Sequence, residues 1–357
     1  MKNKILLIGP LPPLVGGITT VFLTLIKSNI FKLKFKAIVL DSNIASFTGS
    51  RKLWHFLYTL IKTVVILIRE KPDIVHAQIA QSSYLKDTIY LLISKLFGKK
   101  TVAHFHARPD LFDTLTNIKQ KYILGSSRFI DVMVVLTPDT KNLFEQRGWK
   151  SRIMDIPNVV HLPDYAISKK SSNDVIVCQI GRLSLEKGLF TIIEVAQILR
   201  NLPIKFFLAG PFNRKEEKED FFEKTSDLNN IEWCGVVAGL EKIKFLVNSS
   251  YFLLPTIREV LPVVILEAGA AKLTILTSPV GSIPEIIRDG DNGLFIDMQK
   301  PEKIAEKIRW LNKHPNKARK IADSFHQDVV KKYSTDRLDQ ALLYLYSTLL
   351  KVDRKMS

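Results

Sequence analysis

The feature that most constrains the fold is an alternation of short apolar segments with longer segments of helical pattern, which occurs twice along the chain. Five strands are predicted in the first half, at residues 4–9, 36–40, 73–77, 101–106 and 132–137. Five more are predicted in the second half, at residues 174–181, 204–210, 231–235, 251–256 and 273–278. Apolar strands separated by helices are typical of a parallel sheet that is covered on both faces. The sequence therefore predicts an α/β chain with two Rossmann-like domains and a cleft between them.

The length of the chain agrees with this division, because 357 residues exceed what one ordinary core accommodates. We predict a first domain over residues 1–165 and a second domain over residues 171–334. The polar segment Leu162–Asp174 is expected to link them. The apolar residues of 335–357 recur at helical spacing, so this segment is predicted to be a terminal helix that packs back on the first domain.

Basic residues are concentrated in the first half of the chain. Residues 1–170 hold 25 Lys and Arg against 11 Asp and Glu, a net charge of +14, whereas the remainder carries +3. A basic half beside a nearly neutral half suggests that only the first meets a polyanion. Nucleic acid, an anionic membrane face, a diphosphate-bearing substrate and a merely solvated basic surface all remain open at this point.

Cysteine content and hydropathy favour a reducing compartment. Cys178 and Cys234 both lie in apolar segments and are expected to be buried free thiols. The N-terminal apolar run of five residues is too short for a signal peptide. The most hydrophobic stretch, Leu53–Ile68, is shorter than a membrane span and is expected to be a buried helix or a helix that touches a membrane surface. We therefore expect a cytoplasmic protein, peripheral on the inner face of the cell membrane if it binds membranes.

Ligands of doubly wound sheets bind outside the carboxyl ends of the strands, and this rule selects the loops that matter. After the first strand, Gly16 and Gly17 stand where a helix should begin. Glycines at a helix N-terminus let a phosphate approach bare backbone amides, although a plain strand-to-helix turn needs the same residues. The segment is neither a dinucleotide fingerprint nor a P-loop, which argues against a nicotinamide cofactor or an NTPase.

A histidine also stands at a predicted carboxyl end. His106 closes the fourth strand of the first half, and His104 lies two residues deeper with the same parity. A single histidine is more often structural, but the position of His106 makes it a candidate for the site, and His104 a weaker one.

Two cations follow the first strand of the second half. Arg182 offers a planar fork for phosphate oxygens, and Lys187 offers a compact positive charge. Such a pair suits a diphosphate; the alternative is a structural loop in which they pair with Glu186.

Two glutamates flank the apolar segment after the fourth strand of the second half. Glu259 is expected in the loop at the strand end, and Glu267 in the second turn of the helix that follows Pro262. Their structural interpretation is a favourable charge near a helix N-terminus. Their functional interpretation is sugar recognition, because a carboxylate accepts hydrogen bonds from two vicinal ribose hydroxyls.

Asp289 and Asp291 form an Asp-x-Asp pair that could hold a metal on a nucleotide sugar. Gly290 and Gly293 make a simple turn the preferred interpretation.

Taken together, these motifs resemble the retaining glycosyltransferases of family 4, of the bacterial surface-polysaccharide type, which have the GT-B fold. The resemblance rests on "GPLPPLVGG", "KPDIVHAQ", "TVAHFHA", "LTPDTKNLF", "IPNVV", "GRLSLEKG", the two glutamates and "GSIPEIIRDGDNGLFI", in this order over nearly the whole chain. Val260 departs from the glycine that the family often has after the first glutamate. Val159 and His161 depart from the usual Gly and Asp, and these differences bear on sugar geometry and donor choice.

The resemblance implies a role for each matching residue. Arg182 and Lys187 would bind the donor diphosphate, Glu267 the ribose, and Glu259 the donor sugar near the reacting carbon. His106 would touch the donor sugar and assist catalysis. The remaining pair, Gly16 and Gly17, would line the donor-phosphate and acceptor region.

The resemblance also implies the type of reaction. The donor would be a UDP- or GDP-linked sugar, the acceptor a saccharide, expected on a lipid carrier, and no metal or other cofactor would be required. The alternative enzyme is a nucleotide-sugar epimerase of GT-B fold. A non-catalytic nucleic-acid-binding protein is a third alternative, but the sequence shows no helix-turn-helix, zinc finger or basic-aromatic motif.

Overall fold

The computed structural model describes residues 2–12, 16–43, 49–80, 83–107, 115–165 and 174–353. These residues form two compact units, the first made of residues 1–159 with 335–357 and the second of residues 160–334. Residues 160–165, which we predicted to lie in the first domain, belong to the second unit. Much of the predicted linker, residues 166–173, lies outside the described residues.

The first unit contains a six-stranded parallel sheet in the order β2-β1-β3-β4-β5-β6. Its strands are β1 (Lys4–Gly9), β2 (Lys36–Asp41), β3 (Ile74–Ile79), β4 (Lys100–Phe105), β5 (Val132–Val135) and β6 (Arg152–Asp155). The five predicted strands are all present, each within two residues at either end. The prediction missed β6, because its four residues include two exposed ones and carry no apolar run.

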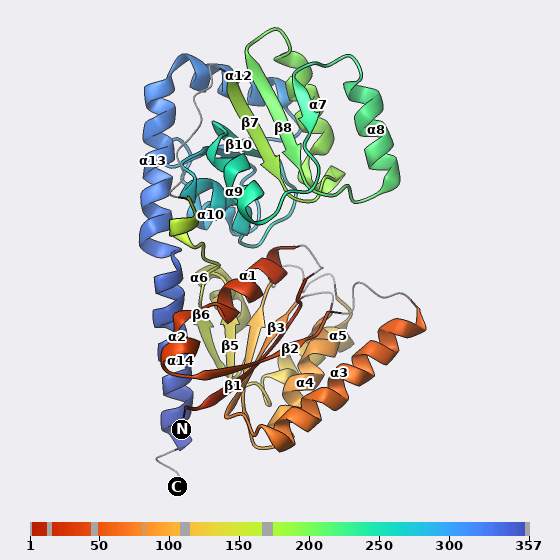
Figure 1. Cartoon of the computed structure of the whole chain (residues 1–357), viewed down its shortest axis with the longest axis vertical. Coiled ribbons are helices and arrows are strands. Elements are labelled where there is room, and N and C mark those ends of the chain that lie inside the picture. The colour runs from red at the N-terminus through yellow and green to blue at the C-terminus, as the bar shows by residue number, and fades with distance from the viewer. Residues whose placement is uncertain are drawn as a thin grey trace. The chain divides into compact units, whose positions relative to one another are not determined.

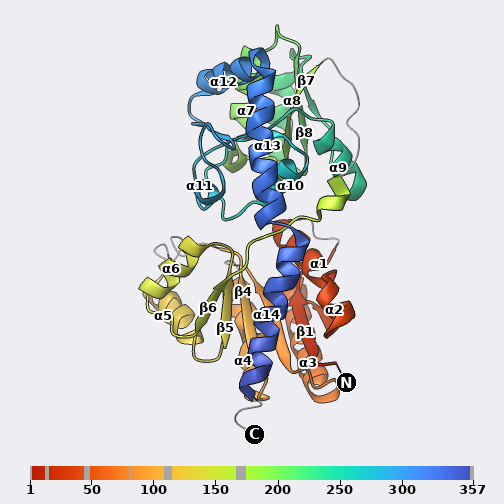
Figure 2. The ribbon, with the colours of Figure 1, turned by 90° about the vertical axis from the view of Figure 1, so that its left-hand side faces the viewer.

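Helices cover both faces of this sheet (Figure 1). They are α1 (Gly17–Ile26), α2 (Asn29–Leu33), α3 (Ser50–Arg69), α4 (Tyr84–Leu96), α5 (Asn117–Ser126), α6 (Pro138–Gln146) and α14 (Thr335–Asp353). One core contains Phe22 of α1 and Leu342 of α14, and the core on the other face contains Leu67 of α3 and Leu91 of α4. The terminal helix α14 packs beside α2 and β1 within the first unit, as Figure 2 shows.

The second unit repeats the architecture, with a parallel sheet in the order β12-β11-β10-β7-β8-β9. Its strands are β7 (Val175–Ile180), β8 (Ile204–Ala209), β9 (Ile231–Trp233), β10 (Tyr251–Leu254), β11 (Thr274–Thr277) and β12 (Leu294–Phe295). The predicted α/β class with two parallel Rossmann-like sheets is therefore confirmed. The two-residue strand β12 was not predicted, since it is too short to give a pattern.

The helices of the second unit are α7 (Leu189–Ile198), α8 (Lys215–Thr225), α9 (Gly239–Val247), α10 (Val263–Ala270), α11 (Ile283–Ile286), α12 (Pro301–Lys313) and α13 (Pro315–Lys332). Two short 3-10 helices, η3 (Leu162–Tyr165) and η4 (Leu185–Lys187), accompany them. Pro262 precedes the first residue of α10, where its missing N–H leaves no donor unpaired. The core contains Phe206 of β8 and Ile192 of α7.

Candidate active site

In each sheet the strand order reverses next to the first strand of the unit. In the second unit, β8 and β9 lie on one side of β7, whereas β10, β11 and β12 lie on the other. The reversal therefore falls between β7 and β10, which pair in parallel. Open α/β sheets bind ligands in the crevice at such a reversal, outside the carboxyl ends of the two strands. The loops that follow β7 and β10 are thus the expected walls of a site.

These two loops are joined through Lys187 and Glu259. Lys187 ends η4 in the loop after β7, and its Nζ forms an ion pair with Oε1 of Glu259 in the loop after β10. The same ammonium donates to the carbonyl of Arg258 at 3.2 Å and to Oγ1 of Thr256 at 3.4 Å. An ammonium has three N–H donors, so each has a partner in this loop. The position of the Lys187 charge is therefore fixed.

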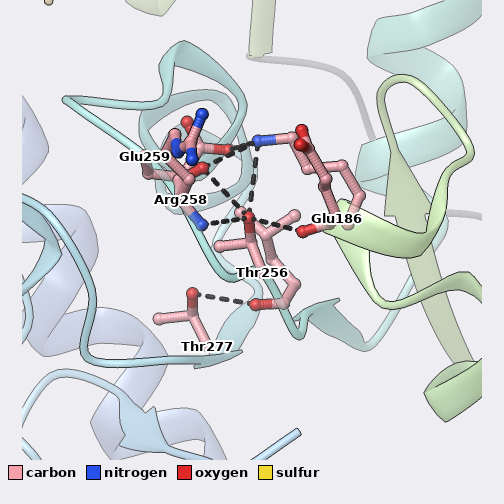
Figure 3. A network of polar contacts seen from close by, with 7 residues as sticks. Glu186, Thr256, Arg258, Glu259 and Thr277 are labelled. Atoms are coloured by element: carbon pink, nitrogen blue, oxygen red, sulfur yellow. Dashed lines mark hydrogen bonds and ion pairs between the residues drawn. The ribbon is translucent and has the colours of Figure 1, made fainter. Parts of the chain in front are cut away.

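Thr256 is the centre of this network, as Figure 3 shows. Its side chain is fully buried, and its hydroxyl lies within 3.1–3.2 Å of the carbonyls of Arg258 and Glu186. Glu186 thus contributes its backbone to the loop, and the backbone N–H of Ile257 also donates to its carbonyl. Of the two loop cations that we considered as partners of Glu186, Lys187 forms its ion pair with Glu259 instead.

Burial raises the pKa of Glu259, and the adjacent Lys187 opposes this rise. The Glu259 side chain is 16% exposed and that of Lys187 is 25% exposed. Removing either charge of a pair that is so little exposed should destabilise the fold, because the remaining charge would be buried without a partner.

Arg182 lies on the exposed side of the loop after β7. One guanidinium nitrogen lies 3.5 Å from Oδ1 of Asn213, a contact at the limit of a hydrogen bond. Among the residues that the structure describes, no carboxylate pairs with Arg182. Its charge is therefore uncompensated there, in contrast to that of Lys187.

Glu267 occupies the second turn of α10, as predicted, but with an unexpected partner. Lys242 of α9 donates to its Oε1 at 2.5 Å. The Glu267 side chain is only 9% exposed, and its burial raises the pKa of the carboxyl group, against the influence of Lys242. Tyr165 of η3 lies close enough for Glu267 to raise the pKa of the phenol, although burial is the larger cause.

We expect Lys242→Met to lower the free energy of unfolding by about 3 kcal/mol, because it leaves the Glu267 carboxylate buried without a counter-charge. Urea denaturation of the full chain measures this difference. Lys215→Met is the matched control, since its partner Glu219 and Lys215 itself are both well exposed. Lys242→Met/Glu267→Gln should recover most of the loss, and an equal loss in the double variant would contradict a charge-based explanation.

In the first unit, Gly16 precedes α1 and Gly17 is its first residue. A Cβ added to either glycine would meet no described atom within 4 Å, and Gly16 has an extended backbone with φ of 175°. The described fold therefore does not itself demand glycine at these two positions. Pro13 of the preceding loop lies outside the described residues.

His106 follows β4 directly and lies half-buried in a histidine cluster, beside two fully buried histidines, His76 and His104. Its Nε2 lies 2.6 Å from Oε1 of Gln78 on β3, to which it donates. Its ring stacks on that of His104 at 4.6 Å, and His104 lies 5.5 Å from His76. Tyr346 of α14 completes the cluster, with its hydroxyl 2.7 Å from Nδ1 of His76. Burial lowers the pKa of His76 and of His106 to about 3, so His106 is a neutral hydrogen-bonding group at neutral pH.

This cluster predicts a loss of stability at acidic pH. A histidine whose pKa is depressed in the folded state binds fewer protons than in the unfolded state, where its pKa is about 6.5. The free energy of unfolding should therefore fall as the pH drops from about 6.5 toward 3, by up to about 1.4 kcal/mol per pH unit for each such histidine. Within the described part of the chain, both ring nitrogens of His104 are buried without a hydrogen-bond partner, and its pKa lies well below the usual value.

We expect His104→Gln to flatten this dependence, measured by urea denaturation between pH 7 and about 5. The raised pKa values of Glu259 and Glu267 act with the opposite sign, so the informative quantity is the difference between variant and parent. His161→Gln, at an exposed position, serves as the control. Identical slopes for His104→Gln and the parent would refute the role of the cluster.

Asp289 and Asp291 lie in the predicted turn. Gly290 has a φ of +79°, Asp289 accepts from the backbone N–H of Phe295 at 2.7 Å, and Asp291 pairs with Arg288. Over the described ranges, no cluster of three or more His, Cys, Asp or Glu side chains is arranged to hold a metal ion.

Sequence reasoning missed three residues that shape the site. Thr256 could have been found, since it is a polar residue at the end of an apolar strand. Gly281, in the loop after β11, has a φ of +59°, and a Cβ there would lie 1.7 Å from the carbonyl oxygen of Glu259, so the glycine lets this loop approach the loop after β10. Lys242 gave no signal, because its pairing with Glu267 depends on how α9 packs on α10.

Comparison with known proteins finds similarity to glycosyltransferases. Residues 164–326 match the family model of glycosyl transferases group 1. The phosphatidylinositol N-acetylglucosaminyltransferase GPI3 subunit of Saccharomyces cerevisiae is 24% identical over 300 residues, which are 80% of this chain and 65% of that protein. The lipopolysaccharide core biosynthesis glycosyltransferase LpsE of Rhizobium meliloti is 25% identical over 63% of this chain and 66% of its own.

The chain spans less than two thirds of the length of the first curated relatives that it matches.

Among solved structures, HepE of Anabaena in complex with UDP and glucose superimposes with a TM-score of 0.76 at 15% identity, over 97% of this chain and all of that one. A glycosyltransferase of Rickettsia africae gives 0.80 at 18% identity, over 98% and 99% of the two chains. At this identity the likeness establishes the fold, which is GT-B.

Proposed function

We propose that this chain, in which residues 164–326 are a group 1 glycosyltransferase domain on a GT-B fold, transfers a sugar from a nucleotide-sugar donor to a saccharide acceptor. One observation carries the proposal. The strand reversal of the second sheet brings the loops after β7 and β10 together, and they hold Arg182, Lys187 and Glu259. These are the charges that an anionic, hydroxyl-rich ligand requires.

The reaction needs stabilisation of the departing diphosphate. When the bond from the anomeric carbon to the phosphate oxygen breaks, the sugar becomes oxocarbenium-like and the diphosphate gains negative charge. Arg182 has no carboxylate partner among the described residues, so it can form a bidentate contact with phosphate oxygens. Lys187 exchanges its longest contact, that to Thr256, for a phosphate oxygen and remains anchored by the other two. Fixed cations of this kind stabilise a transition state without reorganisation.

Glu259 is proposed to contact the donor sugar near the reacting carbon. Its ion pair with Lys187 fixes the carboxylate beside the cation that receives the diphosphate. We favour retention of the anomeric configuration, with the leaving phosphate helping to remove the proton of the acceptor hydroxyl on the same face. The cations of the site supply the charge for this step, so transfer is proposed to need no metal.

Glu267 is proposed to bind the ribose of the donor. Lys242 contacts only one of its carboxylate oxygens, so the other can accept hydrogen bonds from vicinal hydroxyls. Lys242 is thus a positioning residue, and it opposes the rise that burial causes in the pKa of Glu267. In the first unit, His106 is proposed to contact the donor sugar, and Gly16 and Gly17 to line the donor-phosphate and acceptor region.

A lipid-linked acceptor used in surface-polysaccharide or glycan assembly, at the cytoplasmic face of a membrane, is part of the same proposal. It is supported by the charge of +14 on residues 1–170. The names of two relatives, which refer to lipopolysaccharide core and to phosphatidylinositol, are in keeping with it. None of the described helices is long and apolar enough to cross a membrane.

A donor screen tests the proposal. UDP-, GDP-, ADP- and dTDP-sugars are added singly to the full chain, and the thermal midpoint is measured. A donor at a hundredfold excess over its Kd should stabilise the folded state by about 2.7 kcal/mol. The stabilising donor is then incubated with candidate saccharides, and transfer is detected by mass spectrometry. Stabilisation by no sugar nucleotide would refute the proposal, and isomerisation of the donor without an acceptor would establish the epimerase instead.

A further inference from the structure

The helix α3 exposes an apolar stripe along its whole length. Trp54 is 71% exposed and Ile61 is 63% exposed, and both belong to this stripe. Its members are Leu53, Trp54, Leu57, Tyr58, Ile61, Val65 and Ile68. At 100° per residue they cover an arc of about 140°, and the helix is about 30 Å long. Contiguous exposed apolar surface of this extent marks an interaction site.

The stripe is separate from the face by which α3 packs within its own unit. Thr59, Thr63 and Leu67 point inward and are almost fully buried. Phe56 packs near Tyr90 of α4, with ring centroids 5.9 Å apart. The helix therefore has a satisfied inner face, and the outer stripe is additional apolar surface. Of our two expectations for residues 53–68, a fully buried helix is thus wrong, because the sheet and α4 cover the inner face and leave the stripe exposed. A helix that touches a membrane surface stays a prediction.

A row of positive charges follows one edge of the stripe. Arg51, Lys62 and Arg69 are spaced 11 and 7 residues apart, which places them within about 20° of one another around the helix. Residues 50–69 contain no Asp or Glu. The ammonium of Lys62 lies 4.6 Å from the ring centroid of Tyr58, so its stem follows the apolar surface while its charge stays at the edge.

The neighbouring helix α4 adds a second apolar row. Leu85, Leu92 and Leu96 are exposed and recur at helical spacing, and Leu96 is 78% exposed. Both helices pack on the same face of the first sheet and contact each other. The two helices lie side by side on one face of the first sheet (Figure 1), so the exposed apolar residues of both helices face away from that sheet.

We propose that α3 lies in the plane of an anionic phospholipid membrane, with its stripe at the boundary of headgroups and acyl chains and its basic edge on lipid phosphates. An amphipathic helix with aromatic and aliphatic residues on one face and cations beside them has the chemistry of an interfacial helix. A second copy of the chain would cover the stripe, but it would bring another set of cations and no acidic partner on α3. An anionic membrane surface complements both the apolar stripe and its basic edge. This inference does not depend on sugar transfer.

The test is co-sedimentation of the full chain with phosphatidylcholine vesicles, prepared with and without phosphatidylglycerol. We expect the parent to bind the anionic vesicles and Trp54→Glu/Ile61→Glu to bind them more than about tenfold more weakly. Arg51→Gln/Lys62→Gln/Arg69→Gln should bind roughly a hundredfold more weakly, and the parent should lose affinity as salt rises. Thermal melting checks that each variant is folded.

The control is Leu33→Glu/Leu343→Glu, which adds the same charge at exposed apolar positions of α2 and α14, on the opposite face of the sheet. This variant should bind the anionic vesicles as tightly as the parent does, because its two added charges lie on a face away from the lipid. Equal binding by the parent and the two α3 variants would overturn the proposal. So would a parent that binds no vesicle but forms a dimer in solution that Trp54→Glu/Ile61→Glu dissociates, because α3 would then be a contact between copies.

Discussion

Replacing Lys187 by methionine is expected to lower kcat/KM for sugar transfer by roughly 10²–10³, the usual effect of removing one fixed charge or donor from a transition state. The reason is geometric as well as electrostatic. Its ammonium has contacts to Thr256, Arg258 and Glu259, so no other residue can take its place without rebuilding the loop. Initial rates with the donor identified in the screen measure the effect.

The same substitution is expected to destabilise the fold, since it leaves Glu259 buried without its partner. A second variant separates the two effects. Lys187→Met/Glu259→Gln should recover most of the stability but none of the activity. Lys303→Met, at an exposed pair with Glu306, should change neither. Recovery of transfer in the double variant would show that Lys187 acts on the fold alone.

Gly281→Ala is expected to cost more than about 4 kcal/mol of folding free energy and to abolish donor binding. The added Cβ would lie 1.7 Å from the carbonyl oxygen of Glu259, and the φ of +59° already disfavours any other residue. Backbone rather than a flexible side chain is in the way, so the loop after β10 must move. Urea denaturation and the donor-induced thermal shift measure the two consequences.

Gly290→Ala is a close control for this prediction. Gly290 has a φ of +79°, but a Cβ there would meet no described atom within 4 Å. Gly290→Ala should therefore lose only about 1 kcal/mol of folding free energy, the cost of the backbone conformation, and should retain donor binding. If the two alanine variants were equally stable, the close approach of Gly281 to the Glu259 loop would not matter.

The strands could be predicted because parallel strands buried on both faces form continuous apolar runs. β3 is a clear case, with all six residues buried. The same reasoning could not find β6 or β12, which lie at edges of their sheets and are short. The pattern reports apolar runs rather than hydrogen bonding, so the edge strand β2 could be found from its run Ala37–Leu40, whereas β6 and β12 have no such run.

Candidate site residues could be predicted from the rule that ligands bind at carboxyl ends of strands, but their pairing could not. Lys187 was predicted to bind the diphosphate, and the structure adds its ion pair with Glu259. The contact of Glu267 with Lys242 joins α10 to α9 and has no local signature. The expectation that both cysteines are buried is also wrong in part, because Cys178 is buried but Cys234 is only partly buried.

The most direct test of the proposed donor site is a crystal structure of the full chain with UDP or GDP bound. We expect diphosphate oxygens about 3 Å from Arg182 and Lys187, with the ribose hydroxyls on the Glu267 carboxylate. A nucleotide bound away from the loops after β7 and β10, with these side chains not in contact with it, would contradict the assignment.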